Sequence, residues 1–157
     1  MTLPKPVYDA NAQGGGFGEL PEWDLSDLYP AAESPDFTRD MAELERSCTA
    51  FAKAYEGKLA ALDAGGLLAC VEEYQRIDII AGRLMSFAGL RYYQNTIDPE
   101  RAQFMGNAEE RVTNATTALV FFSLEFNRLE DEHLARLLAA SAGLARYKPV
   151  FDRMRAM

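Results

Sequence analysis

The sequence has only one histidine in 157 residues, and it has only two cysteines. One histidine cannot supply a multi-histidine zinc site, and a bundle-type di-iron centre needs two Glu-x-x-His pairs. Two cysteines are too few for a disulfide framework. We therefore expect Cys48 and Cys70 to be reduced thiols in a cytoplasmic protein.

Basic residues and long apolar runs are also scarce. Lysine and arginine number 16 against 24 acidic residues, which gives a formal net charge of -8. Such a chain lacks the basic footprint that phosphate-backbone binding requires, so we expect no nucleic-acid partner. No stretch approaches the ~18 consecutive apolar residues of a membrane span, and the N-terminus lacks the apolar core of a secretory signal. We expect no membrane partner and a cytoplasmic location.

The composition is that of a globular protein, with 48% hydrophobic and 25% charged residues. Residues 1–19 contain two prolines and a glycine-rich run, which predicts a flexible lead-in. That run is not a phosphate-binding loop, because Glu19 follows it where Lys-Ser/Thr would be needed. Residues 20–30 follow as an extended N-terminal arm docked on a core, with Asp27 as the expected cap of a short turn.

Apolar residues at steps of three and four predict three long helices, near residues 35–63, 67–95 and 99–128. Ser34-Pro35 and Asp98-Pro99 have the N-cap and first-residue types that open helices. The expected buried faces are Phe37, Met41, Leu44, Cys48, Phe51, Tyr55, Leu59 and Leu62; then Leu67, Val71, Tyr74, Ile77, Ala81, Leu84, Ala88 and Arg91; then Ala108, Val112, Ala115, Leu119, Phe122 and Phe126. The second helix is apolar on more than one side, which predicts a central position.

Two shorter helices are expected after residue 130, separated by Ser141-Ala142-Gly143. The last carries Leu144 to Met154, and Pro149 fits only in its first turn. No period-two segment indicates a strand. The predicted fold is all-α: an antiparallel bundle of three long helices plus two shorter C-terminal helices, ending in a helix that continues to the last residue.

The candidate catalytic and metal-binding residues of the sequence do not form a complete site. Glu130 and His133 form a single Glu-x-x-His pair, and we expect His133 to be a surface residue in the first turn of a helix. Adjacent carboxylates at 72–73 and 109–110 point about 100° apart on a helix and do not share a face. Glu125 follows two phenylalanines, and a structural ion pair with Arg91, Arg111 or Arg128 is expected. The residues thus give no catalytic, cofactor-binding or metal-binding site.

Four segments resemble, in order, the N-terminal region of oligoendopeptidase F-type zinc metallopeptidases, which are thimet-oligopeptidase-like enzymes. They are residues 20–29 (LPEWDLSDLY), 90–100 (LRYYQNTIDPE), 121–126 (FFSLEF) and 144–148 (LARYK). The second resembles the family's second inter-helix turn, and the third its apolar-then-glutamate segment near the end of the third helix. The resemblance covers about residues 20–157.

The resemblance implies the N-terminal helical domain of an enzyme that hydrolyses short peptides and whose deep channel this region helps to wall. The family's zinc is held by a His-Glu-x-x-His helix and a further glutamate in the C-terminal half of a longer chain, and no such motif is present here. We therefore expect 20–157 to be such a domain without its catalytic domain, itself inactive. A stand-alone acidic helical interaction or dimerisation module is the alternative.

The second helix carries more apolar surface than one buried face accounts for. The additional residues are Ile79, Ile80, Met85, Phe87, Leu90 and Tyr92. An exposed apolar patch usually finds a partner, so we expect a homodimer built from long-helix surface. The alternative is a monomer in which residues 20–30 and 144–157 cover this patch.

Overall fold

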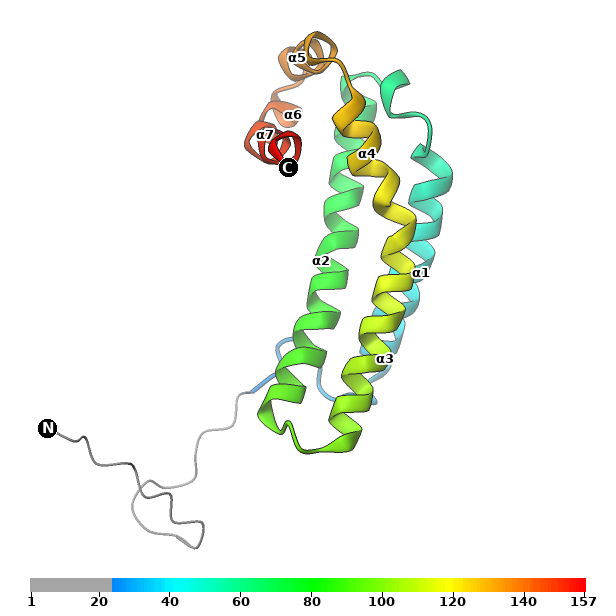
Figure 1. The fold of residues 1–157 in the computed structure, drawn as a ribbon, viewed down its shortest axis with the longest axis vertical. Coiled ribbons are helices and arrows are strands. Elements are labelled where there is room, and N and C mark those ends of the chain that lie inside the picture. Colours follow the sequence, from blue (N-terminus) through cyan, green and yellow to red (C-terminus); the bar gives the residue numbers. More distant parts are fainter. Residues whose placement is uncertain (1–23) are drawn as a thin grey trace, which may run out of the picture.

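The computed structural model describes residues 24–157, which contain helices, turns and extended connections but no strand (Figure 1). The all-α prediction is confirmed. The expected lead-in, residues 1–19, and the start of the 20–29 motif lie outside the described residues. The elements are α1 (Pro35–Tyr55), η1 (Leu59–Ala61), α2 (Ala64–Gln94), α3 (Pro99–Thr116), η2 (Thr117–Leu119), α4 (Val120–Arg128), α5 (Asp131–Ala140), α6 (Ala142–Ala145) and α7 (Lys148–Ala156).

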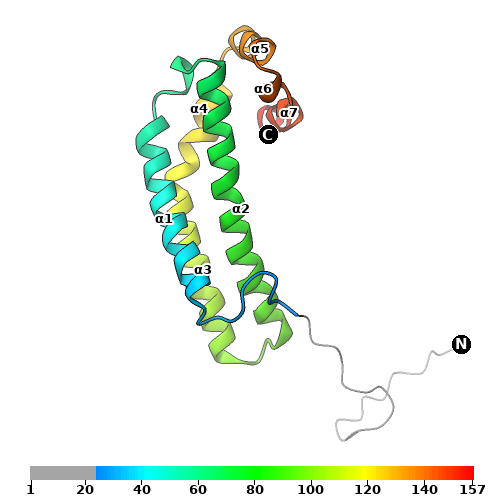
Figure 2. The same ribbon diagram turned by 180° about the vertical axis from the view of Figure 1, so that it is seen from behind.

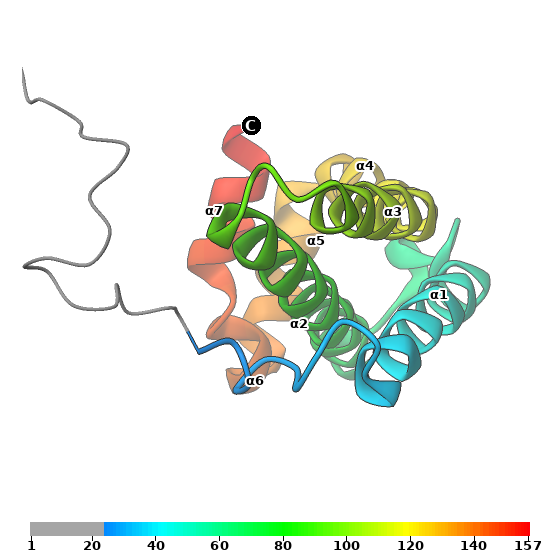
Figure 3. The same cartoon turned by 90° about the horizontal axis from the view of Figure 1, so that it is seen from below.

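The central helix is α2, whose 31 residues span about 46 Å. Viewed along the bundle axis, α1, α2 and the α3–α4 segment occupy the corners of a triangle, and α7 lies beside α2 (Figure 3). The predicted apolar faces meet inside this triangle, where Leu44, Ile77, Leu84 and Phe126 have no exposed surface. The periodicity therefore located the buried faces correctly.

The first turn of the bundle differs from the prediction. Helix α1 ends at Tyr55 rather than near residue 63, because Gly57 adopts a left-handed φ of 77° that favours glycine. The glycines expected to stop the first helix instead open α2. The Asp63 carboxylate caps α2 by accepting the Gly66 backbone N–H at 2.7 Å, and a Cβ on Gly66 would lie 3.1 Å from that oxygen.

The third long segment is interrupted by the 3-10 turn η2. Just before this turn, Thr116 Oγ1 donates to the Val112 carbonyl at 2.8 Å, and Thr117 Oγ1 donates to the Thr113 carbonyl at 2.8 Å. Side-chain bonds back to the i−4 carbonyl perturb a helix, which accounts for the local tightening. Helix α4 continues in nearly the same direction (Figure 1).

The C-terminal part forms three elements instead of the two expected. A turn at Arg146 and Tyr147 separates α6 from α7, and Pro149 lies in the first turn of α7 as predicted. Arg155 on α7 donates to the Leu129 and Phe126 carbonyls at the end of α4 and pairs with Asp131 at the start of α5. One guanidinium therefore joins three helices.

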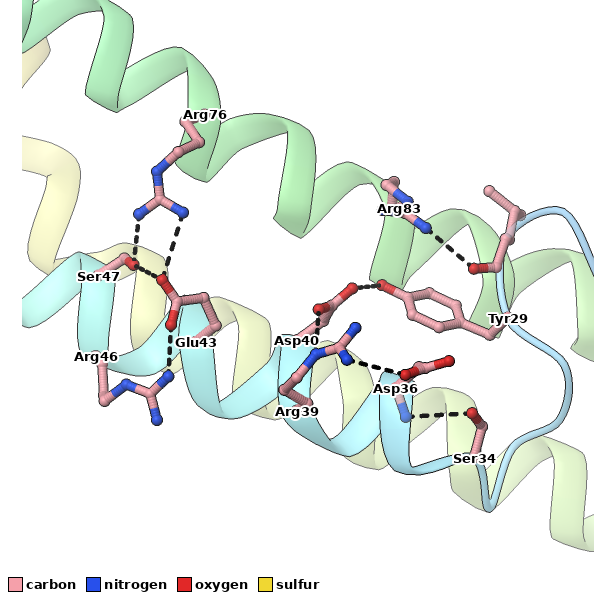
Figure 4. Close-up of polar contacts among 11 residues, drawn as sticks. Tyr29, Ser34, Asp36, Arg39, Asp40, Glu43, Arg46, Ser47, Arg76 and Arg83 are labelled. Atoms are coloured by element: carbon pink, nitrogen blue, oxygen red, sulfur yellow. Dashed lines mark hydrogen bonds and ion pairs between the residues drawn. The ribbon is translucent and has the colours of Figure 1, made fainter.

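Residues 24–34 cross the opposite end of the bundle, from α2 to the start of α1 (Figure 2). Their anchor is Tyr29, which is 2% exposed and packs edge-on against Phe37 and Phe87, with centroid distances of 5.1 and 5.3 Å. Its hydroxyl donates to Asp40 Oδ2 at 2.7 Å, while Arg83 donates to the Leu28 carbonyl (Figure 4). The cap of the short turn is Asp24, which accepts the Ser26 N–H, rather than the expected Asp27.

The half-buried Glu125 on α4 holds the loop between α1 and α2. Its carboxylate accepts the backbone N–H of Gly57 at 2.7 Å and that of Leu59 at 3.4 Å. The arginine partners expected from the sequence are wrong: Arg111 pairs with Glu45, and Arg91 lies over the Phe104 ring. Glu125 thus has a structural role, as expected, but its partners are backbone N–H groups beyond the end of α1 and not an arginine.

Two substitutions at Tyr29 measure the contributions of its hydroxyl and of its ring separately. We expect Tyr29→Phe to lower the free energy of unfolding by about 1–2 kcal/mol through loss of a hydrogen bond to a carboxylate. Tyr29→Ala removes the ring as well and is expected to cost about 3–5 kcal/mol. Urea denaturation measures both values. The control is Tyr55→Phe, whose hydroxyl has no hydrogen bond in the described chain; an equal loss in Tyr55→Phe would contradict the assignment.

Replacing Glu125 tests the loop anchor. Glu125→Ala should lower the free energy of unfolding by roughly 1.5–3 kcal/mol, because two backbone donors lose a charged acceptor, and Glu125→Gln should cost less. Native-state hydrogen exchange should show faster exchange at the Gly57 and Leu59 amides. The matched control is the exposed Glu72→Ala. Unchanged exchange at Gly57 in Glu125→Ala would show that the loop does not depend on this carboxylate.

Candidate functional site

The residues with the most reactive side chains are dispersed over the described part of the chain. Cys48 lies on α1, Cys70 on α2 and His133 on α5, as the sequence predicted. Among residues 24–157, no group of three or more histidine, cysteine, aspartate or glutamate residues is arranged to hold a metal ion. Within the described chain, the two thiols and the imidazole therefore lie on three different helices.

Both thiols are buried without exposed surface and are free, as expected from their positions in the apolar faces. Burial raises the pKa of Cys48 to about 11 and that of Cys70 to about 12, where the nearby Glu125 adds to the effect. The thiolate is the nucleophilic form of cysteine. These residues therefore stay protonated at neutral pH and pack as small hydrophobic side chains.

His133 is the third residue of α5, in its first turn as predicted, but it is half-buried rather than a surface residue. Its Nε2 atom is shielded from solvent and has no hydrogen-bond partner among residues 24–157. The preceding Glu130 is the N-cap residue of α5 and makes no side-chain capping bond. The Glu-x-x-His pair therefore marks the start of a helix, and it faces no second pair.

A polar cluster surrounds Arg76 on the face shared by α1 and α2 (Figure 4). Arg76 binds Glu73 at 2.7 Å, Glu43 at 3.4 Å and the Ser47 hydroxyl at 2.8 Å. Hydrogen bonds from Arg46 and Ser47 lower the pKa of Glu43, and those from Arg76 lower the pKa of Glu73. General acid–base catalysis works best with a pKa near the operating pH, so carboxylates with lowered pKa values are poorly suited to it. Their ion pairs instead hold α1 against α2.

A hollow of about 420 Å³ lies at the end of the bundle under residues 24–33. Its charged lining consists of Asp24, Glu33, Arg91 and Arg101. Arg101 already donates to the Arg91 carbonyl at 2.9 Å and to Gln94 at 3.0 Å. Two acidic and two basic residues give the hollow no preference for a charged ligand of either sign.

A second hollow, of about 210 Å³, is an apolar groove between α2, α4 and α7. It is lined by Val71, Tyr74, Gln75, Asp78, Phe122, Tyr147, Val150, Phe151 and Met154. Small-molecule sites usually occupy about 300–1,000 Å³ and combine apolar walls with several directed polar groups. This groove is smaller and offers few polar groups, so it fits an apolar side chain better than a metabolite.

Sequence reasoning did not find this groove. Its walls come from segments some eighty residues apart, and the position of α7 against α2 determines it. The surplus of apolar residues on the second helix was the available signal. Only part of it is exposed, because Phe87 is covered by Tyr29, Phe37 and Phe104, whereas Ile79 remains 55% exposed.

The raised pKa values of the buried thiols make the free energy of unfolding depend on pH. In the folded chain they keep their protons until pH 11–12, whereas unfolded thiols lose them near pH 9. Above pH 9 the folded state binds more protons, so the free energy of unfolding should fall by up to about 1.4 kcal/mol per pH unit and thiol. Urea denaturation at pH 8 and pH 10 measures this fall.

The double variant Cys48→Ala/Cys70→Ala is the control for this fall. In this variant the free energy of unfolding should fall less between pH 8 and pH 10. The remaining fall comes from tyrosines such as Tyr29, whose pKa is raised by burial and by the hydrogen bond to Asp40. An unchanged pH dependence in the double variant would contradict the assignment to the thiols.

None of the described helices combines the length and the apolarity needed to cross a membrane. No family model matches the chain, and neither a curated protein nor a solved structure was found to be similar to it.

Proposed function

We propose that this chain is the N-terminal helical domain of a zinc metallo-oligopeptidase of the oligoendopeptidase F type. In this role it forms part of the wall of a channel that admits short peptides, and its partner is the catalytic domain of the parent enzyme. The observation that carries the proposal is the order of the four family-like segments along one chain.

The position of these segments in the fold is consistent with the proposal. Residues 90–100 span the turn between α2 and α3, which is the second turn between long helices. Residues 121–126 lie in α4, where the segment's glutamate, Glu125, binds the loop after α1. Residues 144–148 lead from α6 into α7. These three segments thus join elements of the fold, which gives a structural reason for their residue types.

The residues present do not fit the zinc site of such an enzyme. The chain has one histidine, His133 on α5, and its Nε2 atom is shielded from solvent without a hydrogen-bond partner in the described range. We therefore derive no catalytic step for this chain. Its contribution would be a rigid wall of long helices, and the chemistry would belong to the catalytic domain.

An acidic helical interaction module is the second candidate. The observation in its favour is the exposed apolar surface on α2 and the adjoining groove. For either candidate we propose a cytoplasmic protein that binds neither nucleic acid nor membranes, on the basis of its net charge of -8 and its reduced, buried thiols.

The first experiment concerns the parent enzyme. A His-Glu-x-x-His sequence encoded a few hundred codons downstream in the source genome would support the peptidase proposal. A separately expressed catalytic domain should then bind this chain and gain chelator-sensitive hydrolysis of a quenched peptide. A gene that ends without that motif would favour the interaction module.

The chain alone is expected to hold no stoichiometric zinc and to hydrolyse no peptide, since it lacks the three or four ligands of a zinc site. Elemental analysis of the purified chain and a quenched-peptide assay with and without chelator check this. About one tightly held zinc per chain, or hydrolysis that a chelator abolishes, would contradict it.

A further inference from the structure

Large exposed apolar side chains lie at two places along α2, apart from a separate pair on α4, Val120 and Leu124. The first place is the tip of the α2–α3 hairpin, where Tyr93 is 64% exposed and Ile97 is 90% exposed. The second is beside the apolar groove: Val150 on α7, which lines the groove, is 51% exposed, and Ile79, which follows the lining residue Asp78, is 55% exposed. The two places are complementary in shape, because the hairpin tip projects and the groove is concave.

The face of α2 between these two places is open. It carries Gly82, Ser86 and Gly89, which follow one another at steps of four and three and so share one side of the helix. A Cβ built on Gly82 or Gly89 would meet no atom within 4 Å. Small residues with free space above them let another helix approach closely.

The spacing along this face is symmetric about Ser86. Ile79 and Tyr93 lie seven residues to either side of it, about 10 Å along the axis, and Gly82 and Gly89 lie four and three residues away. If a second α2 crossed antiparallel at Ser86, its Tyr93 would meet Ile79, and the turn after that helix, which carries Ile97, would arrive near the groove. Small residues would meet at the crossing and large ones where the helices diverge.

Each place carries a charged side chain without an ion pair in the described chain, and the two are opposite in sign. Residues 146–157 carry four basic residues, of which Lys148 pairs with Asp152 and Arg155 with Asp131. Arg153 and Val150 are three residues apart on α7 and therefore share its side, and Arg153 has no ion pair among the described residues. At the hairpin tip, Asp98 pairs with Arg101 at 3.5 Å, whereas the exposed Glu100 has no ion pair among residues 24–157. Glu100 of one copy would thus face Arg153 of the other.

We propose that this face of α2, from the groove to the hairpin tip, binds a second copy of the chain in a two-fold symmetric, antiparallel contact. Each copy places Tyr93 and Ile97 in or beside the groove of the other, and Ser86 lies at the two-fold axis. Such an interface is isologous, so every contact occurs twice. The inference rests on this chain's own surface and does not depend on the peptidase proposal.

Sedimentation equilibrium at tens of micromolar protein is the first test. The expected result is a species of twice the 17.5 kDa chain mass, and a single species at the chain mass would overturn the proposal. Ser86→Glu places two like charges together at the axis and should weaken dimerisation at least about tenfold. Circular dichroism confirms folding, which this exposed helix position should tolerate. Asn107→Glu, an equal charge change on exposed α3, should have little effect.

Charge reversal tests the orientation. Glu100→Lys lowers the net negative charge, so a nonspecific effect would strengthen association; the proposed contact predicts weakening instead. Arg153→Glu should weaken it as well, and the double variant should restore part of the affinity. A dimer that resists Ser86→Glu, or that Glu100→Lys strengthens, would place the interface elsewhere and overturn the proposal. A monomer that binds a separately expressed catalytic domain through this face would also overturn it.

Discussion

The burial of α2 between α1 and the α3–α4 segment is the constraint on which the other features depend. Its 31 residues form one uninterrupted helix, and α1, α3, α5 and α6 all contact it. A helix with this many neighbours must be apolar on more than one side. Because α2 runs the length of the bundle, the arm, the end hollow and the apolar groove all lie along it.

Polar side chains complete the structure where the helices end. Helix termini leave backbone groups without partners, and buried or half-buried groups of this kind must be satisfied from elsewhere. Glu125 supplies an acceptor to the amides after α1, and Arg155 supplies donors to the carbonyls at the end of α4. Tyr29 and Asp40 similarly attach the arm to α1. These contacts join segments that are separated in the sequence by 11 to 68 residues.

Several of the described thiols and carboxylates have structural roles. The two thiols are protonated core residues, Glu43 and Glu73 are held by Arg76, and Glu125 is bound to a loop. What remains available is surface: a rigid face of α2, a groove at one end and a projecting hairpin at the other. A channel wall and a binding face both use such a surface, and both functions place the reactive chemistry or the selectivity in a partner.

The sequence by itself determined the helical class, the buried faces and the opening residues Ser34-Pro35 and Asp98-Pro99, because these follow from local periodicity and capping chemistry. It did not determine where α1 ends, since the φ of Gly57 is stabilised by Glu125, 68 residues away. Nor did it give the partner of Glu125 or the groove beside α7. Several acceptors or arginines could satisfy the local pattern equally well, and only the packing of distant segments against α2 selected among them.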